Sequence, residues 1–370
     1  MPLTAIAPEE LTALRDSVAA VLAAHGTEAD VRAAMETPSG YDPALWQRLA
    51  QLGVAGLVVP AEYGGSGAGP VELEAVMEEA GAALLCSPLL GSSVLAAAVL
   101  TECGDRAAQA ALLPGIADGS GIVAAGLTGP GGQWTAGGVE VTAAPAGGGW
   151  TLDGIADYVI QGQNAGTLLV AAQDAGGITW FTVRPGDAQV TPLPTFDHTL
   201  RLARLRLSAS PATPLGGRGT GWAAAERALN LARVALAGEQ AGGARRALDR
   251  TVAYSQARIQ FGRPIGSFQA IKHMAADLLL EAESAISAAR HAARELAGGS
   301  AGAQQAIDLA AFACADAFSL VTAASVQMHG GIAFTWEHPA HLYLRRARAD
   351  AQLLGTPSFY RERYVQQLGG

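Results

Sequence analysis

Two short motifs in the second half of the chain combine an arginine with glycines and side-chain amides. The first covers residues 258–269 (RIQFGRPIGSFQ) and the second covers residues 327–331 (QMHGG). A guanidinium such as that of Arg258 binds a pyrophosphate through paired, charge-assisted hydrogen bonds. The Phe261-Gly262 turn and the Gly-Gly pair would let backbone approach such a ligand closely. Each glycine alone fits an ordinary helix C-cap, but capping does not account for the two motifs together at this spacing.

The composition of the chain excludes two other function classes. Only 15% of its 370 residues are charged, against roughly 25% in an ordinary soluble domain, and the formal net charge is −9. A sequence-independent nucleic-acid binder needs a basic face to neutralise phosphates, and we expect no nucleic-acid partner. The three cysteines are far apart and show no CxxC spacing, so they predict neither a disulfide framework nor a zinc site.

The location that we expect for the protein follows from the lack of targeting and membrane signals in its sequence. The first ten residues lack the basic and apolar regions of a signal peptide. Apolar stretches such as residues 94–100 are shorter than the ~20 residues that a membrane span needs. We therefore expect a cytoplasmic protein without a membrane span. Glu337, His338 and His341 resemble a metal cluster only superficially, because no second ligand group accompanies them, and no metal is expected.

The sequence patterns around the two motifs predict the helices and strands that position them, and these elements form an α+β multi-domain fold. Helical spacing predicts an N-terminal α-helical domain over residues 1–118, including a helix that Asp42 caps and Pro43 begins. Residues 119–215 are typical of an antiparallel β domain, with strands near 139–142, 150–152, 167–170, 178–183 and 200–207 and a loop over 208–217. Residues 216–370 predict a C-terminal four-helix bundle, with helices near 222–257, 267–297, 301–328 and 338–368.

With these motifs in this order of domains, the chain resembles the acyl-CoA dehydrogenase family of flavoproteins. Its local sequence near residues 334–337 resembles that of the actinobacterial, steroid-degrading branch of the family. The resemblance implies FAD bound across a subunit interface, an acyl-CoA substrate, a tetramer and an electron-transfer flavoprotein as acceptor. It also implies that a carboxylate removes the α-proton while the β-hydrogen leaves as hydride to the flavin, giving a 2-enoyl-CoA. The cofactor-binding residues that it implies are Thr128, Arg258, Gln260, Phe261, Gln269, Gln327, Gly330, Gly331 and Thr356.

The catalytic base of the family is missing from both of its usual positions. An ungapped comparison places Leu354 where the family carries a glutamate, and Ala232 precedes Arg233 where some members carry an alternative carboxylate. The candidate catalytic residues are therefore Arg233, Leu354 through its backbone N–H as a donor to the thioester oxygen, and Glu239. Glu239 lies two helical turns beyond Ala232, ~11 Å along the axis; its alternative role is a buried carboxylate paired with an arginine such as Arg233 or Arg245.

Two departures in the β domain favour a subunit that shares its flavin site. Residues 127–133 (LTGPGGQ) lack the acidic residue and the Ser-Asp of the family's flavin loop, and residues 158–161 (YVIQ) replace its usual "WIT/S" loop. Three hypotheses remain open: a dehydrogenase subunit of an α2β2 heterotetramer or a homomer with a relocated base, a non-catalytic subunit that completes a partner's flavin site, and an oxygen-using flavoenzyme. Small residues along 223–243 would leave room for a bulky acyl group if they face the pocket.

Overall fold

The computed structural model describes residues 6–369, so residues 1–5, on which the expectation about a signal peptide depends in part, and residue 370 lie outside it. The chain divides into two compact units. Unit 1 contains residues 6–32, Pro70–Leu85 and residues 233–369, and unit 2 contains Ala33–Gly69 and Cys86–Ala232. The N-terminal helices are divided between the units, and the predicted domain boundaries at 118 and 215 stay a prediction.

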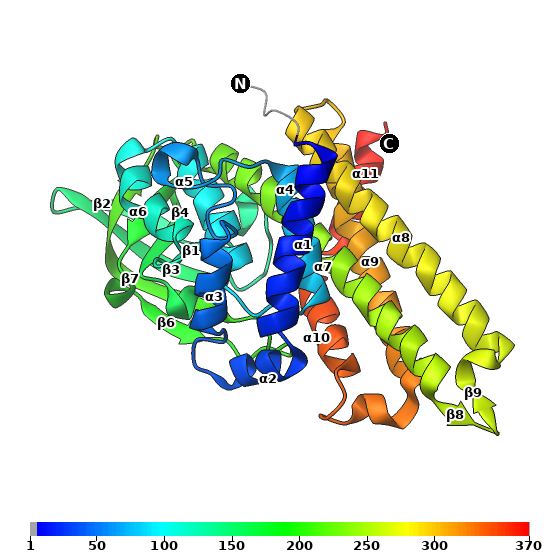
Figure 1. Ribbon diagram of the computed structural model, residues 1–370. Helices are drawn as coiled ribbons and strands as arrows, with labels where there is room; N and C mark the ends of the chain where they lie inside the picture. The colour runs from blue at the N-terminus through cyan, green and yellow to red at the C-terminus, as the bar shows by residue number, and fades with distance from the viewer. Residues whose placement is uncertain (1–5, 370) are drawn as a thin grey trace. The chain divides into compact units, whose positions relative to one another are not determined.

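Unit 2 is built around a seven-stranded sheet (Figure 1). Its strands are β1 (Val123–Gly126), β2 (Thr142–Ala146), β3 (Gly149–Ile160), β4 (Thr167–Asp174), β5 (Gly177–Val183), β6 (Gln189–Pro192) and β7 (Leu202–Leu215). Most pairs are antiparallel, while β1 and β2 pair with β4 in parallel. Because β4 pairs with β2 and with β5, the pairings β4–β2–β3–β7–β5 close a ring around a core that includes Leu168, Phe181 and Leu205.

The helices of unit 2 are α3 (Pro43–Gln51), α5 (Ala97–Cys103) and α6 (Arg106–Ala117), and a π-helical segment, Leu89–Ala96, leads into α5. The predicted start of α3 is confirmed, because the Asp42 carboxylate accepts a hydrogen bond from the backbone N–H of Ala44 and Pro43 begins the helix. Helix α2 (Glu28–Glu36) crosses from one unit to the other.

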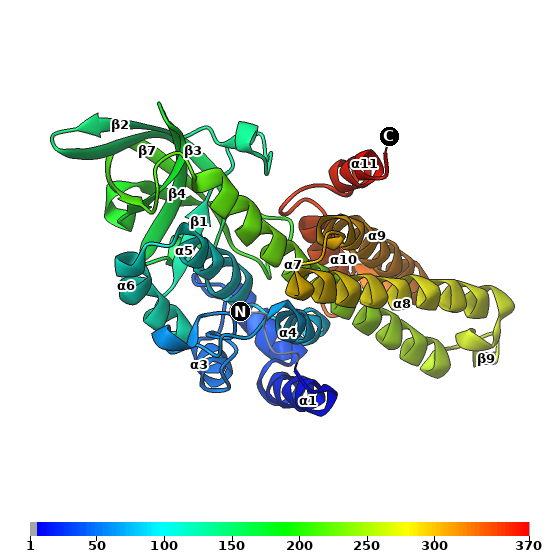
Figure 2. The same ribbon diagram turned by 90° about the horizontal axis from the view of Figure 1, so that it is seen from above.

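Unit 1 is helical, as predicted for the C-terminal part of the chain. Its elements are α1 (Pro8–His25), α4 (Pro70–Ala82), most of α7 (Gly221–Ala257), α8 (Gln269–Gly298), α9 (Ala303–His329), α10 (Ala340–Asp350), α11 (Pro357–Gln367) and a short hairpin of β8 (Ile259–Gln260) and β9 (Arg263–Pro264). Figures 1 and 2 show α8 and α9 side by side along most of their length. As the glycines predicted, Gly299 caps the end of α8 and Gly330 caps the end of α9.

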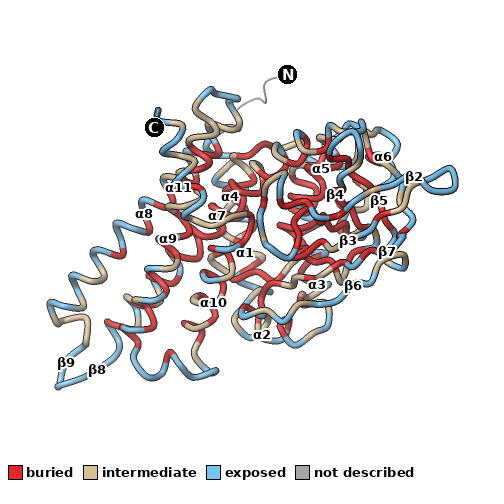
Figure 3. Tube along the Cα trace, turned by 180° about the vertical axis from the view of Figure 1, so that it is seen from behind, coloured by how far each residue is buried: buried red, intermediate tan, exposed pale blue. Residues whose placement is uncertain are grey.

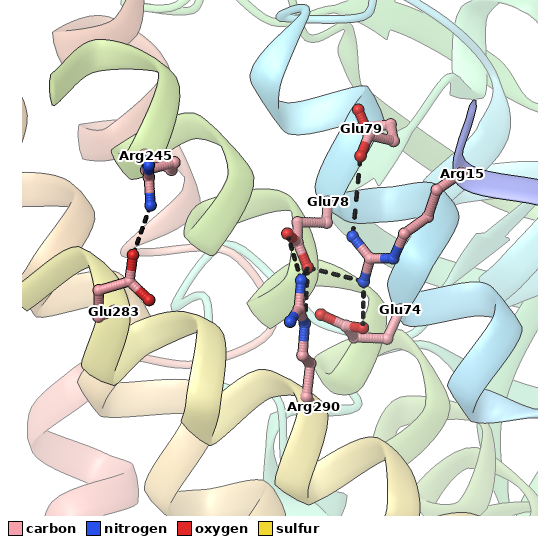
Figure 4. Close-up of polar contacts among 7 residues, drawn as sticks. All are labelled: Arg15, Glu74, Glu78, Glu79, Arg245, Glu283 and Arg290. Carbon is pink, nitrogen blue, oxygen red and sulfur yellow. Dashed lines mark hydrogen bonds and ion pairs between the residues drawn. The ribbon is translucent and has the colours of Figure 1, made fainter. Parts of the chain in front are cut away.

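An ionic cluster connects three helices of unit 1 (Figure 4). Arg15 of α1 forms ion pairs with Glu78 and Glu79 of α4 at N–O distances of 2.9 and 3.7 Å, and its Nη2 donates a hydrogen bond to Glu74 at 3.3 Å. Arg290 of α8 pairs with Glu78 at 2.9 Å. Burial, and then the neighbouring Glu78 carboxylate, raise the pKa of Glu74 to about 8, so the cluster holds a carboxyl group that is protonated at neutral pH.

The structure corrects the prediction of one helix over residues 338–368, because α10 and α11 are separate. Leu354 and Gly355 both have positive φ angles, of 61° and 125°. A right-handed helix cannot continue through residues with positive φ. Pro357 then begins α11, and the Thr356 hydroxyl caps its N-terminus by accepting from the N–H of Phe359.

Several predicted strand boundaries are also wrong. The loop predicted over 208–217 is strand as far as Leu215, since β7 continues through two prolines to pair with β3 and β5. The strand predicted at 139–142 begins only at Thr142. Strands β1 and β6 were not predicted, because each spans only four residues and β1 is buried along its whole length, so it shows no alternation. Short buried strands carry little periodic signal.

One helix among the described residues, Ala303–Phe334, is long and apolar enough to cross a membrane by length and composition alone, and 50% of its most apolar window is buried. It includes α9, which packs against α8, α10 and α11 within unit 1. This packing accounts for the apolar surface of α9, because a core helix of a bundle is also apolar on most sides.

Candidate functional site

The first predicted motif lies in an exposed hairpin at the end of α7. Strands β8 and β9 pair there, and Phe261 (φ 52°) and Gly262 (φ 75°) form the turn between them. Arg258, Gln260 and Gln269 are exposed, and Phe261 is 90% exposed. The hairpin is drawn in pale blue in Figure 3, in contrast to the buried interior of the helices. The side chains that could hold a phosphate-bearing ligand therefore face away from the core of their own unit.

The second motif reaches the same end of unit 1 because α9 ends beside the last turns of α7. The Tyr254 hydroxyl donates to the backbone carbonyl of His329 at 3.3 Å, and the two rings lie 4.4 Å apart. One turn earlier, the hydroxyls of Thr251 and Ser325 are 2.6 Å apart. The fold therefore brings together the two motifs, which are about sixty residues apart in sequence.

One glycine of the first motif and the two glycines of the second have open space beside them. A Cβ atom added at Gly262, Gly330 or Gly331 would meet no atom within 4 Å. Gly262 and Gly330 have positive φ, which accounts for glycine there, but Gly331 does not. Neither backbone conformation nor packing within this chain requires a glycine at position 331. The open space beside these glycines would admit a ligand or another chain.

The same end of unit 1 exposes large apolar side chains, which a protein that works as a monomer would usually bury. They are Ile259, Phe261, Ile332, Phe334 and Trp336, which are between 46% and 90% exposed. Exposed apolar groups concentrated around a candidate site mark an interaction surface. The candidate flavin residues thus lie on a surface suited to contact with another subunit.

The position of the missing base is buried. Leu354 lies in the turn between α10 and α11 and is 1% exposed. The Tyr360 hydroxyl donates to the Leu354 carbonyl, and the Arg233 Nε–H donates to the Tyr360 hydroxyl at 2.9 Å. Arg233 and Tyr360 are also buried. Tyr360 was not found from the sequence, because no motif marks it and only the fold of α11 brings it to Leu354.

Glu239 is a buried carboxylate paired with an arginine, but its partner is neither of the two arginines suggested by the sequence. Its Oε1 accepts from Nε of Arg346 at 2.6 Å and from Nη2 at 2.5 Å. Arg245 instead pairs with Asp249 and Glu283, the latter contact being visible in Figure 4. Because its Oε1 is engaged by the buried Arg346, Glu239 has the structural role of the two that the sequence offered.

The flavin-loop segment of unit 2 is held by its own polar contacts. The Thr128 hydroxyl donates to the Gln133 carbonyl at 2.8 Å, and the N–H of Asp157 donates to the Thr128 carbonyl at 2.7 Å. The Tyr158 hydroxyl donates to the Pro130 carbonyl at 3.3 Å. Thr128 belongs to unit 2, whereas the other candidate flavin residues belong to unit 1.

Comparisons with known proteins show the family of the chain. The chain matches the family model "Acyl-CoA dehydrogenase, N-terminal domain" over residues 8–120 and the model "Acyl-CoA dehydrogenase, C-terminal domain" over residues 219–368. It is 38% identical to acyl-CoA dehydrogenase IpdE2 of Mycolicibacterium smegmatis over 350 residues, 94% of this chain and 96% of that protein.

Two solved structures share the fold at appreciable identity. The ChsE4-ChsE5 complex from Mycobacterium tuberculosis matches with a TM-score of 0.89 and 28% identity, covering 98% of both chains. A variant of the Tcur3481-Tcur3483 steroid acyl-CoA dehydrogenase matches with a TM-score of 0.86 and 31% identity, covering 97% of this chain and 98% of that one. The chain belongs to the acyl-CoA dehydrogenase family of flavin-dependent oxidoreductases.

Proposed function

We propose that this chain is a cytoplasmic subunit of an α2β2 heterotetramer that dehydrogenates an acyl-CoA thioester to the 2-enoyl-CoA, with the base supplied by a related partner subunit. The observation that carries the proposal is the buried Leu354 at the base position. Glu239, the other candidate for the catalytic base, forms an ion pair with Arg346. The flavin-binding end of unit 1, in contrast, keeps its arginine, amides and glycines exposed.

FAD would accept the hydride that leaves the β-carbon of the thioester. Arg258 would bind its pyrophosphate, and Gly330 and Gly331 would allow backbone to approach it. The amides of Gln260, Gln269 and Gln327 offer both donors and acceptors to a nucleotide. Phe261 offers an exposed ring for stacking or for contact with the partner. Thr128 and Thr356 remain proposed flavin contacts.

The proposed partner and acceptor follow from the same surface. Because the flavin residues lie among exposed apolar side chains, a flavin bound there would lie at a subunit interface. The solved relatives include two-component assemblies, ChsE4-ChsE5 and Tcur3481-Tcur3483, which supports a heteromeric partner over a homotetramer. We propose an electron-transfer flavoprotein as the acceptor.

We propose a ring-bearing or branched acyl group, supported by the relative that is titled a steroid acyl-CoA dehydrogenase. The small residues of α7 do not add to this proposal. A Cβ at Gly238 would lie 2.8 Å from the Glu74 carbonyl, and Gly242 and Gly243 are similarly closed by Glu78 and by the ring of Phe318. These glycines permit close packing within unit 1 and leave no room for substrate.

The test is co-expression with the product of a neighbouring dehydrogenase gene that carries a carboxylate at one of the two base positions. We expect a yellow complex with equal numbers of both chains whose flavin is bleached by a steroid side-chain thioester, while the chain alone stays inactive. Comparison with straight-chain thioesters tests the acyl group. A flavin-containing homotetramer of this chain that is bleached without a partner would contradict the proposal.

The burial of Leu354 also favours a second candidate, a structural subunit that only completes the partner's flavin site. Native mass spectrometry separates the two candidates by counting flavins per complex and by locating thioester binding. A complex with fewer flavins than chains, all bound in the partner's cleft, supports the structural subunit.

A further inference from the structure

We propose that His338 positions the second motif only while its imidazole is neutral, so that flavin is released more readily as the pH falls below neutrality. His338 lies in the connecting segment, residues 330–339, which joins α9 to α10 and begins with both glycines of the motif. The inference rests on the proposed function, because it concerns flavin bound at this end of unit 1. In this role His338 is a positioning residue and not a catalytic one.

The first support is the hydrogen bond that the His338 ring accepts. The backbone N–H of Ala340, the first residue of α10, donates to Nδ1 of His338 at 3.2 Å. A backbone N–H can only donate, so Nδ1 carries a lone pair and the neutral ring has its proton on Nε2. The bond satisfies one of the N–H groups that a helix leaves unpaired in its first turn. A proton on Nδ1 would face that N–H and break the bond.

The second support is a row of rings that connects His338 to α9 and α7. The rings of His338 and His329 are 4.6 Å apart, and His329 in turn lies 4.4 Å from Tyr254. His329 is 6% exposed, and its Nδ1 lies 2.8 Å from the backbone carbonyl of Ser325. Because a carbonyl can only accept, Nδ1 of His329 is the donor. His338 therefore packs on a buried imidazole whose orientation is fixed by α9.

The third support is the charge around the His338 ring. Charged and titratable groups from four helices lie near it: Glu28 of α2, Arg250 and Tyr254 of α7, His329 of α9 and His341 of α10. Burial, and then His329, lower the pKa of His338, and burial also lowers the pKa of His329. Glu28 is already paired with Arg250 at 3.2 Å. Protonation of His338 would thus place a cation beside Arg250 and a second imidazole.

Few other contacts hold the connecting segment. Its turns are formed by backbone hydrogen bonds from Thr335 to the Ile332 carbonyl and from His338 to the Thr335 carbonyl. Ala333 and Pro339 are its buried residues, and the residues before His338 are otherwise exposed. Segments with few buried contacts open at a low cost in free energy. Loss of the His338 contacts is therefore expected to release the segment, together with the glycines proposed to lie against the flavin.

The direction of the pH dependence follows from where the imidazole is more easily protonated. In the released segment the ring would be in water, where its pKa is ~6.5, whereas the held segment lowers that pKa. The held form is therefore favoured above pH 6.5, and this preference is lost as the pH falls through that value. Between pH 8 and pH 6 the released population should rise about fourfold, since most released chains carry the proton at pH 6.

Hydrogen exchange of the full chain, read by mass spectrometry at pH 8 and pH 6, measures the release. Labelling times are corrected for the intrinsic effect of pH on exchange. We expect peptides of the connecting segment to exchange about fourfold faster at pH 6 after this correction, while peptides from the buried part of α9 do not change. Equal exchange of the segment at both pH values would overturn the proposal.

Variants of one residue assign the response to His338. The amide oxygen of His338→Asn accepts the same N–H but does not titrate near neutrality, so it should keep the protection seen at pH 8 and lose the pH response. His338→Ala removes the acceptor as well, and its segment should exchange fast at both pH values. His291→Asn, at a 50% exposed side chain of α8, is the matched control and should respond as the natural chain does.

Two results with these variants would contradict the role of His338. One is an unchanged pH response in His338→Asn, which would assign the titration to another group such as His329 or His341. The other is slow exchange of the segment in His338→Ala at both pH values, which would show that the ring does not hold it. Both readouts come from the chain itself and do not depend on its turnover.

The rate of flavin loss from the complex with its partner tests the consequence for the cofactor. After rapid dilution, the fluorescence of freed FAD should appear about fourfold faster at pH 6 than at pH 8 in the natural complex, and at equal rates with His338→Asn. Equal rates in the natural complex would overturn the link between His338 and the flavin. A complex that binds no FAD at either pH would contradict the proposed function, and hydrogen exchange would still decide whether His338 holds the segment.

Discussion

Arg258 is the residue to which the proposed flavin site assigns the clearest electrostatic role. It stands beside the turn at the end of α7, where its side chain is exposed. Charge-assisted hydrogen bonds from a guanidinium to a phosphate are each stronger than neutral ones, so its removal should affect cofactor binding more than folding. The neighbouring glycines have no comparable charge to lose.

Arg258→Ala is expected to weaken flavin binding by the complex about ten- to hundredfold, because hydrogen bonds to charged groups contribute ~1.5–3 kcal/mol. The flavin-to-protein absorbance ratio after dialysis measures the effect. Arg294→Ala, an exposed arginine within α8, is the matched control and should retain its flavin. Equal retention by both variants would remove Arg258 from the site.

Glu74 gives a second prediction at the scale of one residue. The pKa of its carboxyl is raised to about 8 by burial and by Glu78, so the folded chain holds a proton that the unfolded chain releases near pH 4.5. The stability that this proton contributes is present at low pH and is lost as the pH rises toward 8. Between pH 6 and 8 about 2 kcal/mol of the free energy of unfolding would be lost at this one site, since each pH unit between the two pKa values is worth ~1.4 kcal/mol.

Glu74→Gln keeps a neutral group in the cluster with Arg15 and Glu78, so it is expected to flatten this pH dependence. Urea unfolding at pH 6 and pH 9 measures it: the variant should gain stability relative to the natural chain at pH 9 compared with pH 6. Glu72→Gln on the same helix is the control. An unchanged pH slope for Glu74→Gln would show that Glu74 is ionised throughout.

Helix packing in unit 1 depends on glycines of α7 and α4. Added Cβ atoms at Gly81 and at Gly242 would lie closer than 3.0 Å to the backbone carbonyls of Glu239 and Glu78. Backbone cannot move aside as a flexible side chain can, so the two helices would have to separate. The low content of large side chains in this part of α7 therefore reflects helix packing.

Gly242→Ala is expected to destabilise unit 1 by ~3 kcal/mol or more, as overpacking against a rigid neighbour does. The same substitution at Gly298, where an added Cβ meets no atom within 4 Å, should be neutral or slightly stabilising because alanine favours the helix. Thermal unfolding of both variants is the measurement. Equal melting temperatures for both would contradict the close packing of α4 and α7.

At the scale of the whole molecule, the chain combines a buried Leu354 with an exposed end that carries the two motifs of the proposed flavin site. The exposed Phe261, Phe334 and Trp336 surround the two motifs, and burying them requires another chain. Under the proposed function, an isolated copy lacks both the base and the partner surface that would cover the cofactor. Activity is expected only from the assembly.

Phe334→Asp is expected to disrupt assembly, because a charge would be buried without a partner at an apolar contact. Phe334 is 78% exposed, so the fold of the single chain should not change. Size-exclusion chromatography with light scattering measures assembly, and circular dichroism checks the fold. Leu52→Asp, at the 37% exposed Leu52 of unit 2, is the control; an intact complex with Phe334→Asp would exclude this surface as the interface.

The sequence by itself determined the family and the fold class, because the motifs at 258–269 and 327–331 and the order of the elements can be read from neighbouring residues, whereas the loss of the base at Leu354 stays a prediction. Helix ends at Gly299 and Gly330 were predictable for the same reason, since capping depends on neighbouring residues. Only the tertiary structure decided which buried polar groups meet: the Glu239 carboxylate with the Arg346 guanidinium, and the Arg233 guanidinium with the Tyr360 hydroxyl. These contacts join residues more than a hundred positions apart, and no sequence period encodes which side chains meet across packed helices.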